Sequence, residues 1–229
     1  MSAMRYSTSG VNRPIREIAY ETLKHAIITG EIPAGVRIVE TEYASKLHIS
    51  RTPLREALRK LERDGLVEYV IRRGVVVRAF TIEDVEEIYT IRNALEMITL
   101  PAIIENATAK DIQSMREKLK QMDRVMEENN IPQLSVLARA FHDQLTAISG
   151  LKRILRVIQG QDEYIHRFSA LSIAKDTRRA DAHQEHYRIV EAIEARDLQG
   201  LQSVMRKHIE SSKQSCLAAL KDTPLQKKA

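Results

Sequence analysis

The sequence has 229 residues, of which 43% are hydrophobic and 29% are charged. This balance is typical of a globular protein and excludes collagen-like sequence, low complexity and disorder over most of the chain. No apolar run approaches the roughly 20 residues of a membrane-spanning helix, and no apolar signal-peptide core is present, so we expect a cytoplasmic protein without a membrane partner. The single cysteine, Cys216, cannot form an internal disulfide, which agrees with a reducing compartment.

The net charge of +5 lies entirely in the first third of the chain. Residues 1–78 hold 14 Lys and Arg against 9 Asp and Glu, whereas residues 79–229 hold 22 of each kind. A basic segment followed by a neutral one indicates that the first part meets a polyanion and the second does something else. An excess of five charges also arises readily by chance, so charge alone does not establish that the first segment binds a polyanion.

The chain begins with an aperiodic polar tail over residues 1–12, followed by helical patterns. Apolar residues at helical spacing predict a helix over residues 14–29, and Gly30 stands where a C-terminal cap belongs. A second, short helix is expected over residues 41–47. The three residues after it are too few for anything but a tight turn between helices.

A third helix and a hairpin follow this turn. Thr52 as N-cap and Pro53 at the first helical position predict the start of the helix, and Gly65 marks its end. Two runs of β-forming residues, 66–71 and 75–79, then predict a hairpin. Its tip is basic and consists of Arg72, Arg73 and Gly74.

After Phe80 the pattern changes to long helices without further strand signals. Thr81, with Asp84 three residues later, predicts a capped helix that continues to about Asn106. Further helices are expected over residues 110–128, 132–149, 151–171, 176–196 and 197–220. Six helices with short connections predict an antiparallel bundle.

A short helix, a tight turn, a helix entered through Ser-Arg-Thr-Pro and a following hairpin make the plan of a winged helix-turn-helix. On the third helix Arg51, Arg55 and Arg59 lie one turn apart, away from the apolar side. Base edges of DNA are usually reached from this N-terminal half, and the arginine fork can bind both major-groove acceptors of guanine at once. The alternative is the solvated face of an ordinary helix, which the turn, the cap and the wing together disfavour.

The residues beside these arginines suit the DNA backbone and the minor groove. The hydroxyls of Ser50 and Thr52, with the free amides of the helix start, can hold phosphates. Arg72 and Arg73 on the hairpin can enter the neighbouring minor groove, and Gly74 lets the strand turn closely. We therefore expect double-stranded DNA as the partner of the basic segment.

This segment resembles the GntR family of bacterial transcription regulators over about residues 13–79. The resemblance rests on residues 30–35, 40–42, 50–58, 61, 64–66 and 73–74. His48 takes a place where the family often has Gly, because the turn needs a left-handed residue. The resemblance implies DNA contacts at Ser50, Arg51, Thr52, Arg55 and Gly74, and the complete predicted set adds Thr41, Arg59, Arg72 and Arg73.

The remaining helices resemble the effector-binding domain of the FCD subgroup of this family. The resemblance rests on residues 91–96, 141–142, 185–186 and 208. It implies dimerisation through the bundle, and an Asp and three His that hold a divalent metal, which binds a small carboxylate. The histidines are His142, His186 and His208, and three neutral imidazoles suit zinc or nickel.

The chain departs from this pattern at Ala138, where the subgroup has its Asp one helical turn before the first His. Asp143 is adjacent to His142 but points about 100° away on a helical wheel, so it is a poor substitute. Two interpretations stay open. Either the three histidines hold a metal with water in the vacant position, or they bind the effector without a metal.

The other polar residues of the bundle have simpler interpretations. Arg92 is a candidate partner for an effector carboxylate, and the alternative is a salt bridge to Glu96 four residues on. His25, His166 and His183 have no evident partners and are expected at the surface.

The sequence thus predicts a mainly α protein with a winged helix-turn-helix of three helices and a β-hairpin wing, followed by an all-α six-helix bundle. The expected divisions are a tail over 1–12, a DNA-binding domain over 13–79, an effector-binding and dimerisation domain over 80–222 and a tail over 223–229.

The expected function is that of a homodimeric, ligand-responsive transcription regulator on a pseudo-palindromic operator. A metal-dependent hydrolase on the three histidines is the alternative, although no general base, nucleophile elbow, P-loop or dinucleotide motif is evident. A purely architectural DNA-binding protein leaves the neutral bundle unexplained.

Overall fold

The computed structural model describes residues 13–172 and 176–221, without the side chains of residues 162–163, 165–167, 169–172 and 176–177. The chain divides between Phe80 and Thr81 into two compact units. The tails expected at residues 1–12 and 223–229 lie outside the described residues.

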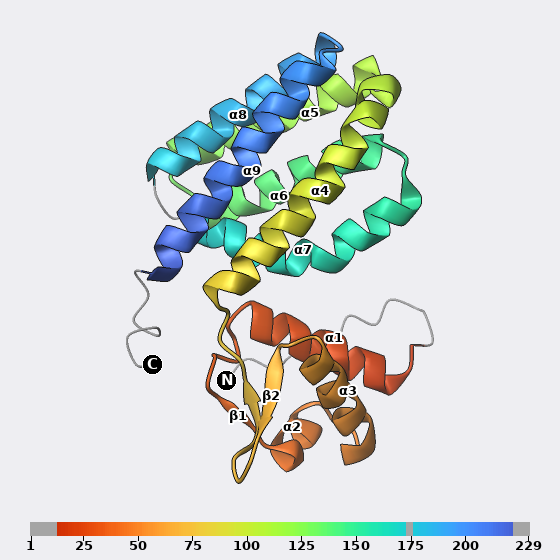
Figure 1. Ribbon diagram of the computed structural model, residues 1–229, viewed down its shortest axis with the longest axis vertical. Helices are drawn as coiled ribbons and strands as arrows, with labels where there is room; N and C mark the ends of the chain where they lie inside the picture. Colours follow the sequence, from red (N-terminus) through yellow and green to blue (C-terminus); the bar gives the residue numbers. More distant parts are fainter. Residues whose placement is uncertain (1–12, 173–175, 222–229) are drawn as a thin grey trace. The chain divides into compact units, whose positions relative to one another are not determined.

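The first unit consists of three helices and a small antiparallel sheet (Figure 1). Its elements are α1 (Ile15–Ile28), β1 (Arg37–Ile38), α2 (Glu40–Lys46), α3 (Arg51–Arg63), β2 (Val67–Val70) and β3 (Gly74–Val77). The strand order is β1-β3-β2, so β3 pairs with both neighbours. The predicted wing is therefore present, and β1 adds a third strand that the sequence analysis missed, since two residues are too few to show alternation.

The core of this unit lies between α1 and α3, which pack against each other. Leu23 and Ile27 of α1 and Leu54 and Leu61 of α3 are almost completely buried. The turn from α2 to α3 has His48 at a φ of 50°, the left-handed conformation expected there. This turn places α3 across the end of α2 and leaves the other side of α3 open to solvent.

The start of α3 differs from the prediction. The helix begins at Arg51 with Ser50 as N-cap, so the assignment of Thr52 as N-cap was wrong by two residues. Pro53 is consequently the third helical residue, where its missing N–H costs nothing because the first amides of a helix have no intrahelical acceptor. Gly74 likewise belongs to β3, opposite Val70, rather than to the tip alone.

The second unit is all-helical, as predicted. Its helices are α4 (Ile82–Asn106), α5 (Ala109–Glu127), α6 (Ile131–Ile148), α7 (Lys152–Ser172), α8 (Asp176–Glu194) and α9 (Leu198–Lys221). In Figure 1 α9 lies beside α4 and α8, and it also packs against α7, while α6 packs against α4, α5 and α7. Large apolar side chains fill the interior, among them Tyr89, Leu100, Ile103, Met115, Phe141 and Phe168. Among the described residues, no helix is long and apolar enough to cross a membrane.

The first helix of this unit is held at its start by the predicted cap. The Thr81 hydroxyl accepts from the backbone N–H of Asp84, and the Asp84 carboxylate accepts from the N–H of Thr81 at 2.8 Å. This reciprocal pair satisfies two amides that the helix itself leaves without acceptors. The capping box thus fixes the first residue of α4, directly after the boundary between the two units.

We expect Thr81→Ala to lower the free energy of unfolding by about 1 kcal/mol, because one half of the capping box is lost. Urea unfolding of the full chain, followed by circular dichroism, measures the effect. Thr90→Ala in the same helix is the matched control, since its exposed hydroxyl bonds only to the carbonyl oxygen of Glu86, and it should change stability by less than about 0.5 kcal/mol. Equal losses in both variants would contradict the role of the cap.

Candidate functional site

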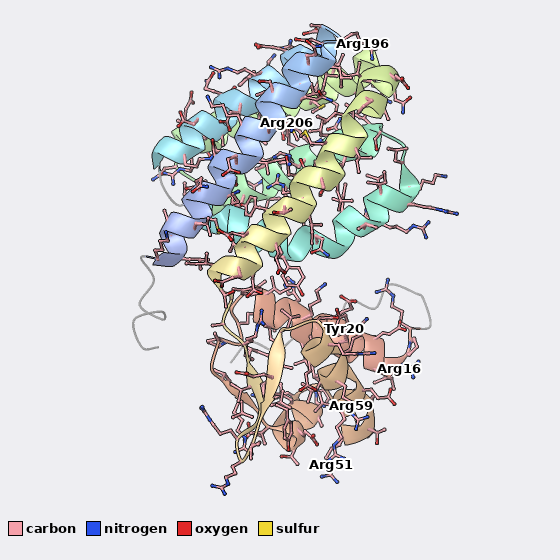
Figure 2. All side chains as sticks on the ribbon, viewed as in Figure 1. Arg16, Tyr20, Arg51, Arg59, Arg196 and Arg206 are labelled. Carbon is pink, nitrogen blue, oxygen red and sulfur yellow. The ribbon has the colours of Figure 1, made fainter. Side chains whose placement is uncertain are left out.

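The outer face of α3 presents the predicted arginines to solvent. Arg51, Arg55 and Arg59 are exposed, and Figure 2 shows Arg51 and Arg59 projecting from the helix. Arg55 Nε donates to Glu40 Oε2 at 2.7 Å, an exposed ion pair that ties α3 to α2. Because exposed pairs contribute little, Arg55 can exchange this partner for an anion at small cost.

The ends of α3 and the wing carry the remaining predicted DNA contacts. Ser50, Thr52 and, in the first turn of α2, Thr41 are exposed, so their hydroxyls face solvent beside the positive end of a helix dipole. At the wing the N–H of Arg73 donates to the carbonyl oxygen of Val70 at 3.0 Å and closes the turn. The structure therefore places these side chains on the surface, and their contact with DNA stays a prediction.

Arg72 at the tip of the wing has a φ of 66°, in the left-handed region. A residue with a side chain is strained there by roughly 1 kcal/mol or more, whereas glycine is not. Arg73 beside it is also exposed. The tip thus holds an arginine at a position where glycine would relax the backbone, and the contact of Arg72 with DNA stays a prediction.

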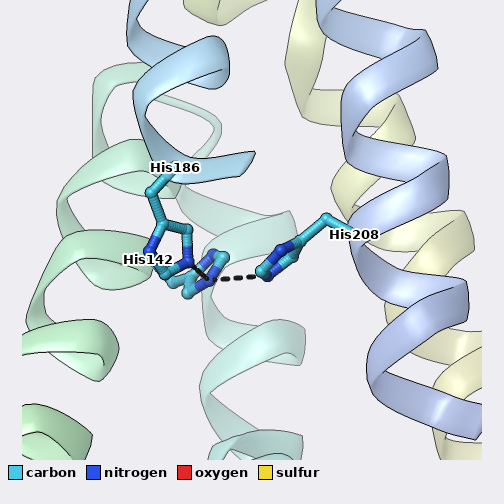
Figure 3. A group of neighbouring side chains, drawn as sticks. All are labelled: His142, His186 and His208. Atoms are coloured by element: carbon cyan, nitrogen blue, oxygen red, sulfur yellow. Dashed lines mark hydrogen bonds between the residues drawn. The ribbon is translucent and has the colours of Figure 1, made fainter. Parts of the chain in front are cut away.

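Three histidines from three helices converge inside the second unit (Figure 3). His142 on α6, His186 on α8 and His208 on α9 turn their Nε2 atoms toward one another. His142 Nε2 lies 3.2 Å from His186 Nε2 and 3.2 Å from His208 Nε2. The structure thus brings together the three residues that the sequence analysis selected.

The surroundings favour the neutral form of these imidazoles. Burial lowers the pKa of His142 and His186 well below the ordinary histidine value; the charge of Arg92 adds to this effect at His142, and the neighbouring His208 adds to it at His186. Burial also lowers the pKa of His208, against the opposing effect of Glu185. Each ring therefore carries one N–H and one nitrogen lone pair, the form in which histidine binds metals.

The N–H protons of the three imidazole rings cannot satisfy both contacts of His142 Nε2 at once. His208 Nδ1 is 2.9 Å from Glu185 Oε2, and because a carboxylate only accepts, this contact favours the proton on Nδ1 and the lone pair on Nε2. Arg178 Nη2 lies farther from the same Nδ1, at 3.5 Å, and donates to the carbonyl oxygen of His208 at 3.1 Å. A single proton on His142 Nε2 can point at only one of its two neighbours. Within the described residues the Nδ1 atoms of His142 and His186 have no hydrogen-bond partner.

A divalent cation fits the space between the three Nε2 atoms. Zinc–nitrogen bonds of about 2.0–2.1 Å in tetrahedral geometry would place the nitrogens about 3.3 Å apart. The two separations from His142 Nε2 are each 3.2 Å, and all three ligand atoms lie within 4.8 Å of one another. With a cation present, each ring directs a lone pair at it and keeps its proton on Nδ1. The three neutral imidazoles therefore suit zinc or nickel, as the sequence predicted.

No carboxylate completes the cluster among the described residues. They contain one group of His, Cys, Asp and Glu side chains within ligand reach of one another, and it consists of the three histidines. Ala138 carries no donor, and Asp143 is exposed and pairs with Arg139 at 3.9 Å. A metal held here has positions left for water or for a ligand from outside the chain.

Two buried charged residues beside the cluster, Arg178 and Glu185, were not predicted as functional residues from the sequence. Arg178 Nη1 donates to Glu185 Oε2 at 2.8 Å, and Arg178 Nη2 donates to the carbonyl oxygen of His208 at 3.1 Å. The only available signal was the position of Glu185 next to His186, because partners separated by many residues leave no periodic pattern.

Arg92 adopts the salt bridge that was the alternative to effector binding. It is buried, and its Nε donates to Glu96 Oε1 at 2.6 Å. Glu96 Oε2 is also buried and has no hydrogen-bond partner within the described residues. Both residues lie inside the bundle, so Arg92 remains close enough for its charge to act on the histidines.

His183 is not at the surface, contrary to the prediction. It is buried because its side of α8 packs against α5, and its Nε2 lies 2.6 Å from Asp123 Oδ1. Tyr187 donates its hydroxyl to Asp123 Oδ2 at 2.6 Å. His25 is exposed as predicted, and the side chain of His166 lies outside the described residues.

Comparison with known proteins matches both units to described families. Residues 15–77 match the family described as bacterial regulatory proteins, gntR family, and residues 87–211 match the FCD domain. The HTH-type transcriptional regulator YdhC of Bacillus subtilis (strain 168) is 30% identical over 87% of this chain and 84% of its own length. The Nta operon transcriptional regulator of Aminobacter aminovorans is 31% identical over 68% of this chain and 72% of its own length.

Solved structures agree with these matches. A transcriptional regulator described as a GntR family member, from Pseudomonas syringae pv. tomato str. DC3000, is 26% identical, with a TM-score of 0.55 over 93% of this chain and 89% of its own. McbR/YncC of E. coli has a TM-score of 0.70 at 20% identity over 92% of this chain and all of its own, which supports the fold alone.

The Asp123 cluster predicts how stability depends on pH. Burial alone would raise the pKa of Asp123, but the hydrogen bonds from Tyr187 and His183 outweigh it and lower the pKa. The interaction therefore stabilises the fold fully above the ordinary Asp value of about 3.9 and is lost as the pH falls through the lowered pKa. We expect the free energy of unfolding to fall more steeply from pH 5 to pH 3 in the wild type than in Asp123→Asn, as measured by urea unfolding. Parallel curves for the two proteins would contradict this role.

Proposed function

Because this chain belongs to the GntR family of bacterial regulators and joins a winged helix-turn-helix to an FCD domain, we propose that it binds a pseudo-palindromic operator as a homodimer whose DNA affinity is modulated by a small carboxylate. The family and the names of its relatives point to a DNA-binding transcriptional regulator rather than an enzyme, and nothing in them supports the alternative of a hydrolase. The observation that carries the ligand-responsive part is the convergence of three imidazole nitrogens in the second unit, from the buried His186 and His208 and the half-buried His142.

The two functions are assigned to the two compact units. Residues 13–79 form the DNA-binding domain, and residues 80–222 form the effector-binding and dimerisation domain. The division of the chain between Phe80 and Thr81 supports this assignment. Residues 1–12 and 223–229 are assigned to neither function.

The first unit reads DNA through α3. Arg51, Arg55 and Arg59 supply guanidinium groups to the major groove, while the hydroxyls and amides at the start of α3 hold phosphates. The wing arginines add contacts in the minor groove. The exposure of the arginine side chains and the strained backbone of Arg72 support these roles.

The second unit holds the effector at the histidine cluster. His142, His186 and His208 would hold a divalent cation, which would supply a positive charge for a carboxylate oxygen, and the absence of the Asp at position 138 would leave a ligand position for that oxygen. The effector and the operator then change each other's affinity by the same factor, typically equivalent to 1–3 kcal/mol. The alternative hypothesis is that the histidines bind the carboxylate directly, without a metal. The effect of a chelator on effector binding distinguishes the two hypotheses.

Dimerisation follows from the size of one recognition helix, which covers only a few base pairs, so that tight specific binding needs two helices related by a two-fold axis. A surface suited to a second copy of this chain lies on α4. Ile91 and Ile98 are 41% and 56% exposed, and seven residues place them on one side of the helix. Burial of these two side chains against a second copy would remove apolar surface from water, and this is the contact that we propose for the dimer.

Sequence-specific binding should depend on the arginines of α3. We expect Arg51→Ala or Arg55→Ala to cost about 1–3 kcal/mol at one base position, whereas Arg72→Ala weakens all sequences alike. Fluorescence anisotropy with operator and random duplexes at physiological salt measures both effects. Arg188→Ala, an exposed arginine of the second unit, controls for net charge. If the double variant Arg51→Ala/Arg55→Ala still distinguishes operator from random duplex, the assignment of α3 is wrong.

The protein should sediment at twice its chain mass of 26.2 kDa at micromolar concentration. Ile91→Glu/Ile98→Glu should give monomers, because charges would be buried in the interface, while Val136→Glu on α6 serves as an exposed apolar control. Analytical ultracentrifugation and a footprint on the operator provide the measurements. A wild-type monomer with a non-symmetric footprint would overturn the homodimer, and an intact dimer in the double variant would exclude the α4 surface.

Metal binding should respond to Ala138 and to the histidines. Ala138→Asp should tighten zinc or nickel binding, since a charged ligand replaces water on the helical face of His142, and His186→Ala should abolish it. Competition with a chromophoric chelator measures affinity, with exposed His25→Ala as the control.

Two further outcomes would correct this part of the proposal. If a chelator leaves effector binding unchanged while His142→Ala and His208→Ala remove it, the histidines bind the carboxylate unaided. If the variant without all three histidines still responds to the effector, the sensing site lies elsewhere in the bundle.

A further inference from the structure

The three histidines of the cluster differ in how their outer nitrogens are held. Within the described residues, the Nδ1 atoms of His142 and His186 have no hydrogen-bond partner, whereas His208 Nδ1 lies 2.9 Å from Glu185 Oε2. One of the three rings is thus fixed by a buried carboxylate. This asymmetry gives Glu185 a role that its place in the sequence does not suggest.

Glu185 is itself held firmly in position. Arg178 Nη1 donates to the same oxygen, Oε2, at 2.8 Å, while Arg178 Nη2 reaches the carbonyl oxygen of His208 at 3.1 Å. Glu185 and Arg178 are only 3% and 8% exposed. Glu185 Oε2 therefore has two donors within hydrogen-bond distance, Arg178 Nη1 and His208 Nδ1, which fix the carboxylate between α8 and α9.

The arrangement follows from the spacing along α8. Arg178 and Glu185 are seven residues apart, about two helical turns, and therefore lie on the same side of the helix. His186 is the next residue and points about 100° away, which directs it to the cluster while Glu185 contacts α9. A single helix thus supplies one ring of the cluster and the carboxylate behind another ring.

We propose that Glu185 is a positioning residue that prepares His208 for a divalent cation, and that Arg178 holds Glu185 in place. The carboxylate keeps the His208 proton on Nδ1, so the Nε2 lone pair faces the other two rings before any ion arrives. This inference rests on the proposed metal site.

A purely structural role would not need a charge at this position. A buried ion pair gains little stability over apolar residues of similar size, because removing both charges from water offsets their attraction. The contact of Glu185 with His208 Nδ1, directly behind the nitrogen that faces the cluster, is what distinguishes it from the pair of Arg92 and Glu96. The effect on the histidine proton is therefore the property to measure.

The first measurement uses the full chain without metal. Nitrogen-15 NMR of the histidine rings should show His208 as the Nδ1–H form in the wild type and in Glu185→Gln, whose amide oxygen still accepts. In Glu185→Ala the His208 signals should move toward a mixture of both tautomers. Thermal unfolding of the same samples checks that the fold is retained, and Glu185→Gln keeps the shape if Glu185→Ala does not fold.

The second measurement is the affinity for Zn²⁺ alone, by competition with a chromophoric chelator. Loss of an outer carboxylate typically weakens metal binding 10–100-fold, so we expect a loss on the order of 10-fold or more for Glu185→Ala and a smaller one for Glu185→Gln. Glu191→Ala, an exposed glutamate of the same helix, should bind like the wild type.

Each outcome has a separate meaning. Folded Glu185 variants that bind zinc within about twofold of the wild type, or an unchanged His208 tautomer in Glu185→Ala, overturn the inference and leave the metal site intact. A wild-type protein that binds no zinc overturns the metal site and the metal part of this inference, while the tautomer measurement still tests the contact between Glu185 and His208.

Discussion

Three neutral imidazoles that face one another inside a helical bundle are the constraint on which the second unit depends. Nitrogen lone pairs about 3 Å apart require protons or a cation between them, and the protons available cannot satisfy both contacts of His142. Three helices, α6, α8 and α9, must keep their register for this contact to exist. The cap at the start of α4 and the Asp123 cluster between α5 and α8 hold the surrounding helices, so they support the cluster without touching it.

Charge inside the bundle is balanced before any ligand arrives. Arg92 is paired with Glu96, and Arg178 is paired with Glu185. Among the described residues the cluster itself contains no carboxylate, so a divalent cation held by the three histidines would bring positive charge that an anion from outside the chain could offset. This requirement gives a physical reason for a carboxylate effector and for a response that depends on its presence.

Most helices could be predicted from the sequence because their apolar residues repeat over many turns. The start of α3 was misplaced by two residues because Ser50 and Thr52 are both good caps, and β1 is too short to leave a pattern. The three histidines were found through a family resemblance. The contacts of Arg178, Glu185, His183 and Asp123 could not be predicted, since they join residues whose proximity depends on helix packing.

The most direct test of the metal site is X-ray absorption spectroscopy of the full chain after loading with one equivalent of zinc. A metal site made by His142, His186 and His208 predicts a first coordination shell of three imidazole nitrogens at about 2.0–2.1 Å, together with oxygen donors. The imidazole scattering should disappear in a variant that lacks His142, His186 and His208. A shell of oxygen donors alone in the wild type would contradict a metal site formed by the three histidines.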